Sequence, residues 1–459
     1  MEGSRQKTRY EQPALWDEAK GEALSDSRQG TEPPAASRAP ESPAETRFLM
    51  EVVAGRNNME KALKRVMANK GSPGADGMRV QELPGHLDEN WDDIKEQLMT
   101  GTYQPSPVRR VEIPKPTGGT RPLGIPTAID RLIQQAIAQV LNPIFDAGLS
   151  GSSYGFRPGR SAHQAVERAQ GYIEEGYAWV VDMDIEKFFD NVNHDALMAR
   201  VARKVADKRV LKTIRAFLNS GVMEGGLISP TDIGTPQGGP LSPLLSNIYL
   251  DDLDRELERR GHRFVRYADD CNIYVASERA GKRVMKSLSR FLEKKLKLKV
   301  SSAKSAVTRP FRTSFLGFSF TWGENPRRRI APKAIDRLKK RVRELTRRTR
   351  GISLEQMIAD LNRYIRGWRS YFGFCQTPSV LRDLDSWIRR RLRSFIWKQM
   401  KRGRRRYAEL AAQGVGKDLA ARTAGSTHGP WRVSKSPALH YAFKNANLSA
   451  LGLISLEHG

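Results

Sequence analysis

The sequence contains very little cysteine. Cys271 and Cys375 are the two cysteines among its 459 residues, which excludes a disulfide framework and any zinc module built from several cysteines. A chain with so few thiols is most simply an intracellular protein that keeps them reduced. Cys271 is interpreted as a small buried strand residue, the usual role of a free cysteine.

Long apolar runs are also absent. No run approaches the roughly 20 residues that a membrane-spanning helix needs. The first residues, Met1 to Lys7, lack the apolar core of a signal peptide. We therefore expect no membrane partner and a cytoplasmic location.

Acidic residues are too few to balance the basic ones. The chain has 78 Lys and Arg against 51 Asp and Glu, a formal net charge of +27 and a pI near 10.2. Residues 326–350 hold twelve Lys or Arg and two acids, and residues 389–406 hold ten and none. Ordinary charge runs are solvated helix faces, but runs this unbalanced repel themselves. Because Trp, Tyr and Phe are interleaved with them, they favour contact with nucleic acid.

The composition changes along the chain and predicts its domains. Residues 1–45 are rich in Glu, Pro, Ala, Ser and Gly, and we expect them to be disordered. From about 108 to 325, strand patterns alternate with amphipathic helices, which predicts an α+β or α/β core. Residues 326–400 are predicted to be helical, and a small basic tail follows at 401–459.

One apolar stripe stands out in the helical region. Ser353, followed by Gln356 three residues later, predicts a capping box that opens a helix. The stripe recurs at spacings of four, three and four residues, as expected for one helix face. Its members are Leu361, Ile365, Trp368 and Phe372.

Two adjacent carboxylates are predicted at the tip of a β-hairpin. Tyr267-Ala268-Asp269-Asp270 lies between strand-like residues 263–266 and 272–275. A solvated Asp-Asp turn is the simplest interpretation, but a second carboxylate-bearing strand, residues 179–184, lies upstream. Asp182 and Asp184 share one face of that strand, so strand parity leaves both open.

Carboxylates from two segments of a basic protein point to phosphate chemistry. Mg²⁺ prefers hard oxygen ligands and often binds through a few carboxylates plus substrate phosphates. Two such ions about 3.5–4 Å apart can activate an attacking hydroxyl and stabilise the leaving oxygen. The pattern therefore predicts metal-dependent phosphoryl or nucleotidyl transfer.

Two further segments suit a phosphate-bearing substrate. Residues 234–243, with Gly238 and Gly239, form a glycine loop before a predicted helix and permit close backbone approach. Residues 111–126 read as a hairpin with a Gly-Gly tip. Lys115 and Arg121 flank that tip and could clamp a triphosphate, although ordinary turns and exposed basic residues would give the same pattern.

These elements, together with Ser152-Ser153-Tyr154-Gly155-Phe156-Arg157-Pro158, resemble reverse transcriptases in their order and spacing. The likeness is to those encoded within bacterial group II introns, which also act as splicing maturases, and it covers about residues 46–459. It implies a right-hand polymerase of α+β fold. Fingers and palm would span 46–325, an α-helical thumb 326–400 and a short DNA-binding region 401–459.

The resemblance also implies residue roles. Asp184, with the backbone of Ile185, matches the first metal ligand because a bulky ring, Phe189, follows five residues later. Asp269 and Asp270 match the catalytic pair, and two Mg²⁺ ions are implied, with Mn²⁺ as an alternative ion. Phe189 resembles the ring that excludes a 2′-hydroxyl, and a core phenylalanine is its structural alternative.

Contacts to the incoming dNTP are implied for a further set of residues. These are Lys115, Arg121, Phe189, Gln237, Gly238 and Lys304, of which Lys304 resembles the lysine near the leaving pyrophosphate and could equally be a surface residue. Phe315-Leu316-Gly317-Phe318 resembles the hairpin that grips the primer. Nucleic-acid contacts are expected at Arg157, Tyr267, Arg337, Lys340, Arg366, Trp368, Arg389, Arg390, Arg404 and Arg405.

The implied activity is RNA-directed DNA synthesis with help in intron splicing and mobility. The expected partners are group II intron RNA, as template and splicing substrate, a DNA target and primer, and dNTPs. No cysteine pair follows Cys375, so the chain resembles the endonuclease-lacking, group IIC-like class. The alternatives are a splicing cofactor with little polymerase activity, a reverse transcriptase with a defence or diversification role, and an RNA polymerase, which Phe189 opposes.

Overall fold

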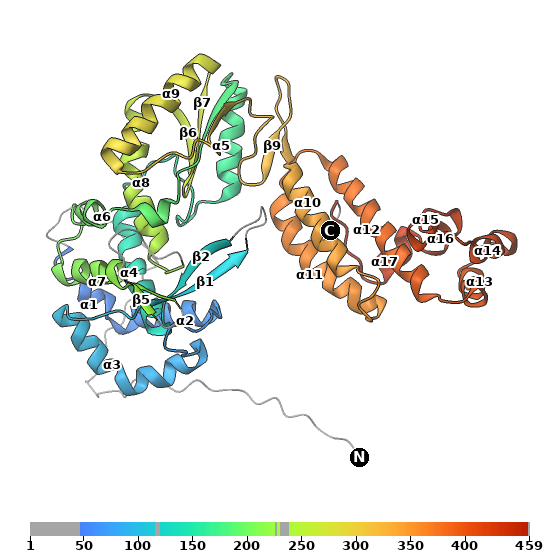
Figure 1. The fold of residues 1–459 in the computed structure, drawn as a ribbon, viewed down its shortest axis with the longest axis horizontal. Coiled ribbons are helices and arrows are strands. Elements are labelled where there is room, and N and C mark those ends of the chain that lie inside the picture. Colours follow the sequence, from blue (N-terminus) through green and yellow to red (C-terminus); the bar gives the residue numbers. More distant parts are fainter. Residues whose placement is uncertain (1–45, 115–119, 225–226, 230–237, 458–459) are drawn as a thin grey trace, which may run out of the picture. The chain divides into compact units, whose positions relative to one another are not determined.

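The computed structural model describes residues 46–114, 120–224, 227–229 and 238–457 (Figure 1). The predicted disordered tail 1–45 lies outside these residues, as do Lys115 and Gln237. The chain divides into two compact units. The first holds Met1–Ser161, Asp182–Ile273 and Lys282–Ala306, and the second holds Ala162–Val181, Tyr274–Gly281 and Val307–Gly459.

Helices of the N-terminal two thirds follow the predicted amphipathic segments. Thr127 caps one of them, α4, by accepting a hydrogen bond from the backbone N–H of Asp130. Helix α8 begins directly after the glycine loop, with proline in its first turn. The helices are α1 (Leu49–Val53), α2 (Arg56–Ala68), α3 (Leu83–Thr100), α4 (Ala128–Asp146), α5 (Ala162–Glu174), α6 (His194–Val201), α7 (Lys208–Asn219), α8 (Ser242–Arg259) and α9 (Glu278–Phe291).

Three sheets accompany these helices. One has the order β2-β1-β4-β5, another β6-β7-β3-β8, and the third is the pair β10-β9. The predicted hairpin of residues 111–126 is confirmed, because β1 and β2 pair antiparallel with Pro114 opposite Thr120. The strands are β1 (Val108–Pro114), β2 (Thr120–Ile125), β3 (Trp179–Met183), β4 (Val222–Glu224), β5 (Leu227–Ser229), β6 (Arg263–Tyr267), β7 (Asp270–Val275), β8 (Ala306–Thr308), β9 (Phe318–Phe320) and β10 (Arg328–Ile330).

The C-terminal region is helical from Pro332 onward, whereas Arg328–Ile330, at the start of the segment predicted to be helical, forms strand β10. Ser353 accepts the backbone N–H of Gln356 at 3.1 Å and caps α11, while the Gln356 side chain donates to Asp360 instead of closing a capping box. The predicted stripe is the buried face of α11. The helices are α10 (Pro332–Leu345), α11 (Leu354–Phe372), α12 (Pro378–Gln399), α13 (Gly403–Ala412), α14 (Lys417–Ala424), α15 (Pro430–Val433), α16 (Pro437–Ala442) and α17 (Asn445–Ala450).

The helices after β10 share one apolar core. It runs from Ile330 to Leu456 and includes Trp397 of α12 as well as Leu439 of α16. The Asp385 carboxylate accepts the backbone N–H of Leu456 at 2.9 Å. The boundary predicted at residue 400 therefore does not separate two cores, and the domain limits inferred from the sequence stay predictions.

The mixture of helices with antiparallel sheets confirms the α+β class. In the part of the chain that the structure describes, no helix is long and apolar enough to span a membrane.

Candidate active site

The hairpin predicted around the Asp pair is present. β6 ends at Tyr267 and β7 begins at Asp270, so Ala268 and Asp269 form the turn. Ala268 has φ 57°, a left-handed conformation that is uncommon for a residue with a side chain. A tight turn held in this way presents both carboxylates at one end of the hairpin.

Asp184 lies just beyond the end of β3, whereas Asp182 is within the strand. The Asp184 backbone N–H donates to Ser305 Oγ at 3.0 Å, and its carbonyl accepts the N–H of Ser301 at 2.9 Å. Lys304 donates from Nζ to Asp184 Oδ1 at 3.2 Å. The segment 301–305 therefore fixes the Asp184 backbone, and Lys304, whose side chain is largely exposed, supplies a counter-charge to the Asp184 carboxylate.

The carboxylates influence one another electrostatically. Although Asp270 reaches solvent, desolvation by surrounding atoms, followed by repulsion from Asp269, Asp182 and Asp184, raises the pKa of Asp270 to about 6. Lys304 partly opposes this shift. Such crowding of negative charge is costly without a cation.

The donor set fits a hard divalent cation, since it offers carboxylate oxygens from separate chain segments. Among the described residues, however, no three Asp, Glu, His or Cys side chains stand close enough together to form a ready-made metal site.

A buried ion pair stabilises the hairpin that carries Asp269 and Asp270. The sequence pattern did not predict it. Arg266 donates to both Asp254 oxygens, at 2.7 and 2.6 Å, and both side chains are fully buried. The same guanidinium donates to Asn247 Oδ1 and to the carbonyl of Ala268 at 2.8 Å. Arg266 therefore ties the turn that carries Asp269 to helix α8. An arginine at an inward strand position was the available signal.

The 152–158 motif runs beside β6. Tyr154 and Arg266 are joined by a backbone hydrogen bond of 2.9 Å. Asn247 donates to the carbonyl of Gly155 at 2.8 Å. A Cβ placed on Gly155 would lie 2.3 Å from the backbone nitrogen of Ala268. Only glycine at position 155 allows this segment to approach the turn at Ala268 so closely.

Arg157 of this motif does not behave as a nucleic-acid contact. Its side chain is buried and pairs with Asp146 at 2.7 Å. It also donates to the carbonyls of Ser153 and Asp146, each at 2.9 Å. Because these acceptors occupy the guanidinium, its role here is to hold the motif in shape.

The remaining substrate residues are only partly described. Phe188 is the buried ring of its segment, while Phe189 is half-buried and packs edge-on against it at 5.1 Å. This leaves Phe189 better placed than Phe188 to meet a substrate. Ile185 is buried and bridges Val300. Arg121 lies on β2 opposite Ile113, and Lys115 and Gln237 fall outside the described residues.

Gly238 has the backbone that the glycine loop requires. Its φ of 124° favours glycine, and a Cβ there would lie 2.6 Å from the carbonyl oxygen of Gly124 on β2. Gly238 therefore packs tightly against the strand that carries Arg121.

The residues expected to contact nucleic acid differ in how much of each side chain is exposed. Tyr267 is half-buried near Phe156, Trp368 is buried against Phe372, and Arg390 stacks on Trp431 at 3.7 Å. Arg389 lies 3.7 Å from Asp385. The exposed members are Arg337, Lys340, Arg366, Arg404 and Arg405.

A hollow of about 430 Å³ adjoins the predicted primer hairpin. Leu316 and Gly317 line it on one side, and Arg337, Tyr364 and Trp368 from α10 and α11 line the other. The primer-hairpin residues and the helical region thus share a surface within one compact unit.

Comparison with known families agrees with this geometry. Residues 113–320 match the model described as "Reverse transcriptase (RNA-dependent DNA polymerase)". Residues 335–413 match the model described as "Group II intron, maturase-specific domain". The chain therefore contains a reverse transcriptase domain followed by a maturase domain.

Two curated bacterial proteins are similar to this chain over part of their length. Protein YkfC of Escherichia coli is 36% identical over 218 residues, which are 46% of this chain and 57% of that protein. The group II intron-encoded protein LtrA of Lactococcus lactis is 31% identical over 323 residues, which are 56% of this chain and 54% of LtrA. The chain thus spans about half the length of these relatives.

A solved structure titled "Partial Cas6-RT-Cas1--Cas2 complex" is 27% identical and covers 55% of this chain and 44% of its own, with a TM-score of 0.36. A likeness at that score adds nothing to the assignment. Through the two matched domains and these curated relatives, the chain is similar to the reverse transcriptase/maturase proteins encoded by group II introns.

Proposed function

We propose that this chain is an RNA-directed DNA polymerase that copies group II intron RNA and assists its splicing. The observation that carries the proposal is the meeting of Asp184 and Lys304 with the Asp269–Asp270 hairpin. The partners would be the intron RNA, a DNA target and primer, and dNTPs. A cytoplasmic location belongs to the same proposal.

The reaction joins the primer 3′-oxygen to the α-phosphorus of a dNTP and breaks the bond to the pyrophosphate. Asp184, Asp269 and Asp270, with the Ile185 carbonyl, would hold two Mg²⁺ ions or Mn²⁺. When bound, these ions would lower the pKa of the primer hydroxyl and neutralise charge on the leaving oxygen. This use of the carboxylates accounts for why the protein concentrates them despite their mutual repulsion.

The chain's own residues would position the reactants. Lys304, released from Asp184, would donate a proton to the departing pyrophosphate. Phe189 would lie under the sugar and exclude a 2′-hydroxyl. Lys115 and Arg121 would hold the triphosphate, and Gln237 with Gly238 would contact the nucleotide.

Primer extension on an RNA template with Mg²⁺ and dNTPs tests the proposal. Wild type should extend the primer, and Asp269→Ala should not. Asp195→Ala is the matched control, because Asp195 is an exposed carboxylate that pairs with Arg215, and it should extend normally. Extension by Asp269→Ala at the wild-type rate would refute the assignment of the carboxylates.

A splicing cofactor without useful synthesis is the second candidate, favoured by the maturase-specific domain. Under the primary proposal, Asp269→Ala loses synthesis while its support of intron splicing survives. Tight RNA binding and splicing support, with no extension by wild type, would favour the second candidate.

A further inference from the structure

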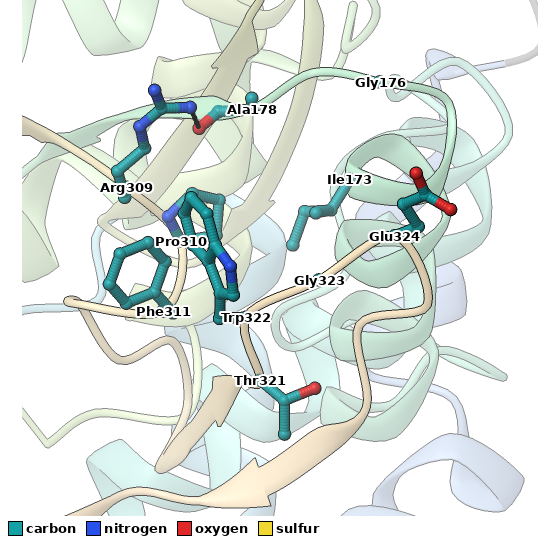
Figure 2. A pocket seen from close by; sticks show the side chains of 10 residues that line it. All are labelled: Ile173, Gly176, Ala178, Arg309, Pro310, Phe311, Thr321, Trp322, Gly323 and Glu324. Atoms are coloured by element: carbon teal, nitrogen blue, oxygen red, sulfur yellow. Dashed lines mark hydrogen bonds between the residues drawn. The ribbon is translucent and has the colours of Figure 1, made fainter.

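A separate hollow lies in the second compact unit and takes no part in the proposed reaction. It has a volume of about 310 Å³. Its walls come from the end of α5, the segment after β8 and the turn between β9 and β10, all within that unit. Figure 2 shows Phe311, Pro310 and Trp322 on one side of it, with Ile173 and Glu324 on the other. We call it the Trp322 pocket.

Trp322 is the most exposed large apolar side chain in the described part of the protein, at 73%. Phe311 packs against it at right angles with ring centroids 4.9 Å apart. This contact holds the indole in place without a face-to-face stack. Trp322 and Phe311 therefore form an aromatic surface open to solvent beside a hollow, a combination typical of ligand-binding grooves.

The surroundings of the pocket are basic. Residues 309–329 contain five arginines and a single acid, Glu324. Arg309 lies over the Trp179 ring at 4.4 Å and donates to the Ala178 carbonyl at 3.2 Å, so its guanidinium is fixed at the rim. Arg312 lies 5.6 Å from the Phe311 ring centroid. A partner with negative charge next to a flat apolar group would complement this pattern.

We propose that the Trp322 pocket binds one unpaired base of a single-stranded RNA. The inference rests on the proposal that the chain handles intron RNA, and it adds a contact outside the carboxylate site. Unpaired RNA bases splay out and stack on aromatic rings, while arginines follow the backbone. A volume near the lower limit of roughly 300 Å³ for ligand pockets accommodates one ring system rather than a protein helix.

Glu324 gives the pocket a preference among bases. Its carboxylate accepts hydrogen bonds, and cytosine presents an amino group as donor whereas uracil does not. A cytidine oligomer should therefore bind more tightly than a uridine oligomer of equal length. Glu324→Gln should reduce that preference.

The test measures binding of a fluorescent single-stranded cytidine RNA to the full chain by anisotropy. Trp322→Ala should weaken binding about tenfold, as expected for loss of one base stack, and Trp322→Phe should keep most of the affinity. Phe48→Ala is the control, because Phe48 is similarly exposed at 70%, and it should bind like wild type. Because Trp322 is so exposed, its truncation should leave folding intact.

Photocrosslinking locates the base directly. An RNA carrying 5-iodocytidine should crosslink to Trp322 or Phe311, as mapped by mass spectrometry of peptides. Crosslinks confined to other segments, or unchanged RNA affinity in Trp322→Ala, would overturn the inference and leave a protein side chain as the better occupant. Equal or tighter binding of the matching DNA oligomer would overturn the choice of RNA.

Primer extension on a pre-annealed short duplex separates this inference from the proposed function. Wild type and Trp322→Ala should extend that duplex equally. If wild type neither extends nor binds RNA, the proposed function fails. If wild type does both while the Trp322 variants bind like wild type, the pocket inference fails alone.

Discussion

The two compact units use charged side chains in different ways. In the first, Arg157, Arg266 and Arg209 are enclosed by carboxylates and carbonyls, and they hold loops in position. In the second, cations such as Arg337, Lys340 and Arg366 project from helices into solvent. The enclosed arginines fix the geometry of the first unit, and the exposed cations of the second are available to a polyanion. The second unit also encloses some arginines, such as Arg393. The positive charge of this chain therefore has two roles: enclosed cations hold the fold in place, and exposed cations are available to bind a polyanion.

The largest expected effect on stability comes from breaking the buried ion pair of Arg266 and Asp254, which holds the turn carrying Asp269. Arg266→Met leaves Asp254 as an unpaired buried charge, which should cost about 3–5 kcal/mol of unfolding free energy. Urea unfolding followed by circular dichroism measures it. The control is Arg259 on helix α8, an exposed arginine whose partner Glu256 also pairs with Arg260, and Arg259→Met should cost less than about 1 kcal/mol. Equal losses in the two variants would erase the contrast between the units.

A buried carboxylate in the first unit should make stability depend on pH. Burial, opposed by hydrogen bonds from Thr127, Tyr103 and Ser106, raises the pKa of Asp130 to about 6. Because the folded pKa exceeds the unfolded value of about 3.9, this contribution is complete below pH 4 and is lost as pH rises through 6.

Thermal unfolding between pH 4 and 7 measures this contribution. Asp130→Asn should flatten the dependence, which amounts to at most about 3 kcal/mol. An unchanged slope in the variant would assign the pH dependence to other groups.

A substitution that moves the turn carrying Asp269 and Asp270, without removing a charge, tests whether the position of this turn matters for synthesis. Gly155→Ala would push a Cβ against Ala268, so the hairpin must move, and the rate of primer extension should fall about a hundredfold, close to 2.7 kcal/mol. Gly151→Ala is the control, since a Cβ there meets nothing within 4 Å. RNA affinity should be unaffected in both variants, whereas loss of RNA binding in Gly155→Ala would point to general misfolding.

The smallest expected effect concerns single exposed cations of the second unit. Arg366→Ala should leave stability within about 0.5 kcal/mol. It should reduce the slope of log affinity against log salt for RNA by about one unit. Anisotropy titrations at several salt concentrations measure this. An unchanged slope would mean that Arg366 contacts no phosphate.

The regular elements of this protein were predictable because their signals are local. The stripe through Leu361 and Trp368, the Ser353 cap and the hairpin around Asp269 follow from period and turn chemistry. The site was predictable as a set of carboxylates, but the choice between Asp182 and Asp184 came from the family resemblance. The structure adds a physical basis, because Asp184 lies past the strand end, where Lys304 and Ser305 reach it.

Long-range polar contacts were not predictable. Arg266 and Asp254 meet because a helix packs under a strand, and no local pattern announces that pairing. Arg157 was expected to contact nucleic acid because basic residues usually lie on the surface. Three nearby carbonyls and Asp146 instead make burial tolerable. Such residues are decided by tertiary packing, which composition does not reveal.

Under the proposed function, Asp184 and the Asp269–Asp270 pair, which come from two separate segments, bind one cluster of divalent cations. Replacing Mg²⁺ with Fe²⁺ in the presence of a primer–template and dNTP, then adding ascorbate and peroxide, cleaves the backbone next to bound metal. The account predicts cleavage near both Asp184 and Asp269–Asp270 in wild type, with loss of both in Asp269→Ala and retention in Asp195→Ala. Cleavage at only one of these segments, or at neither, would contradict it.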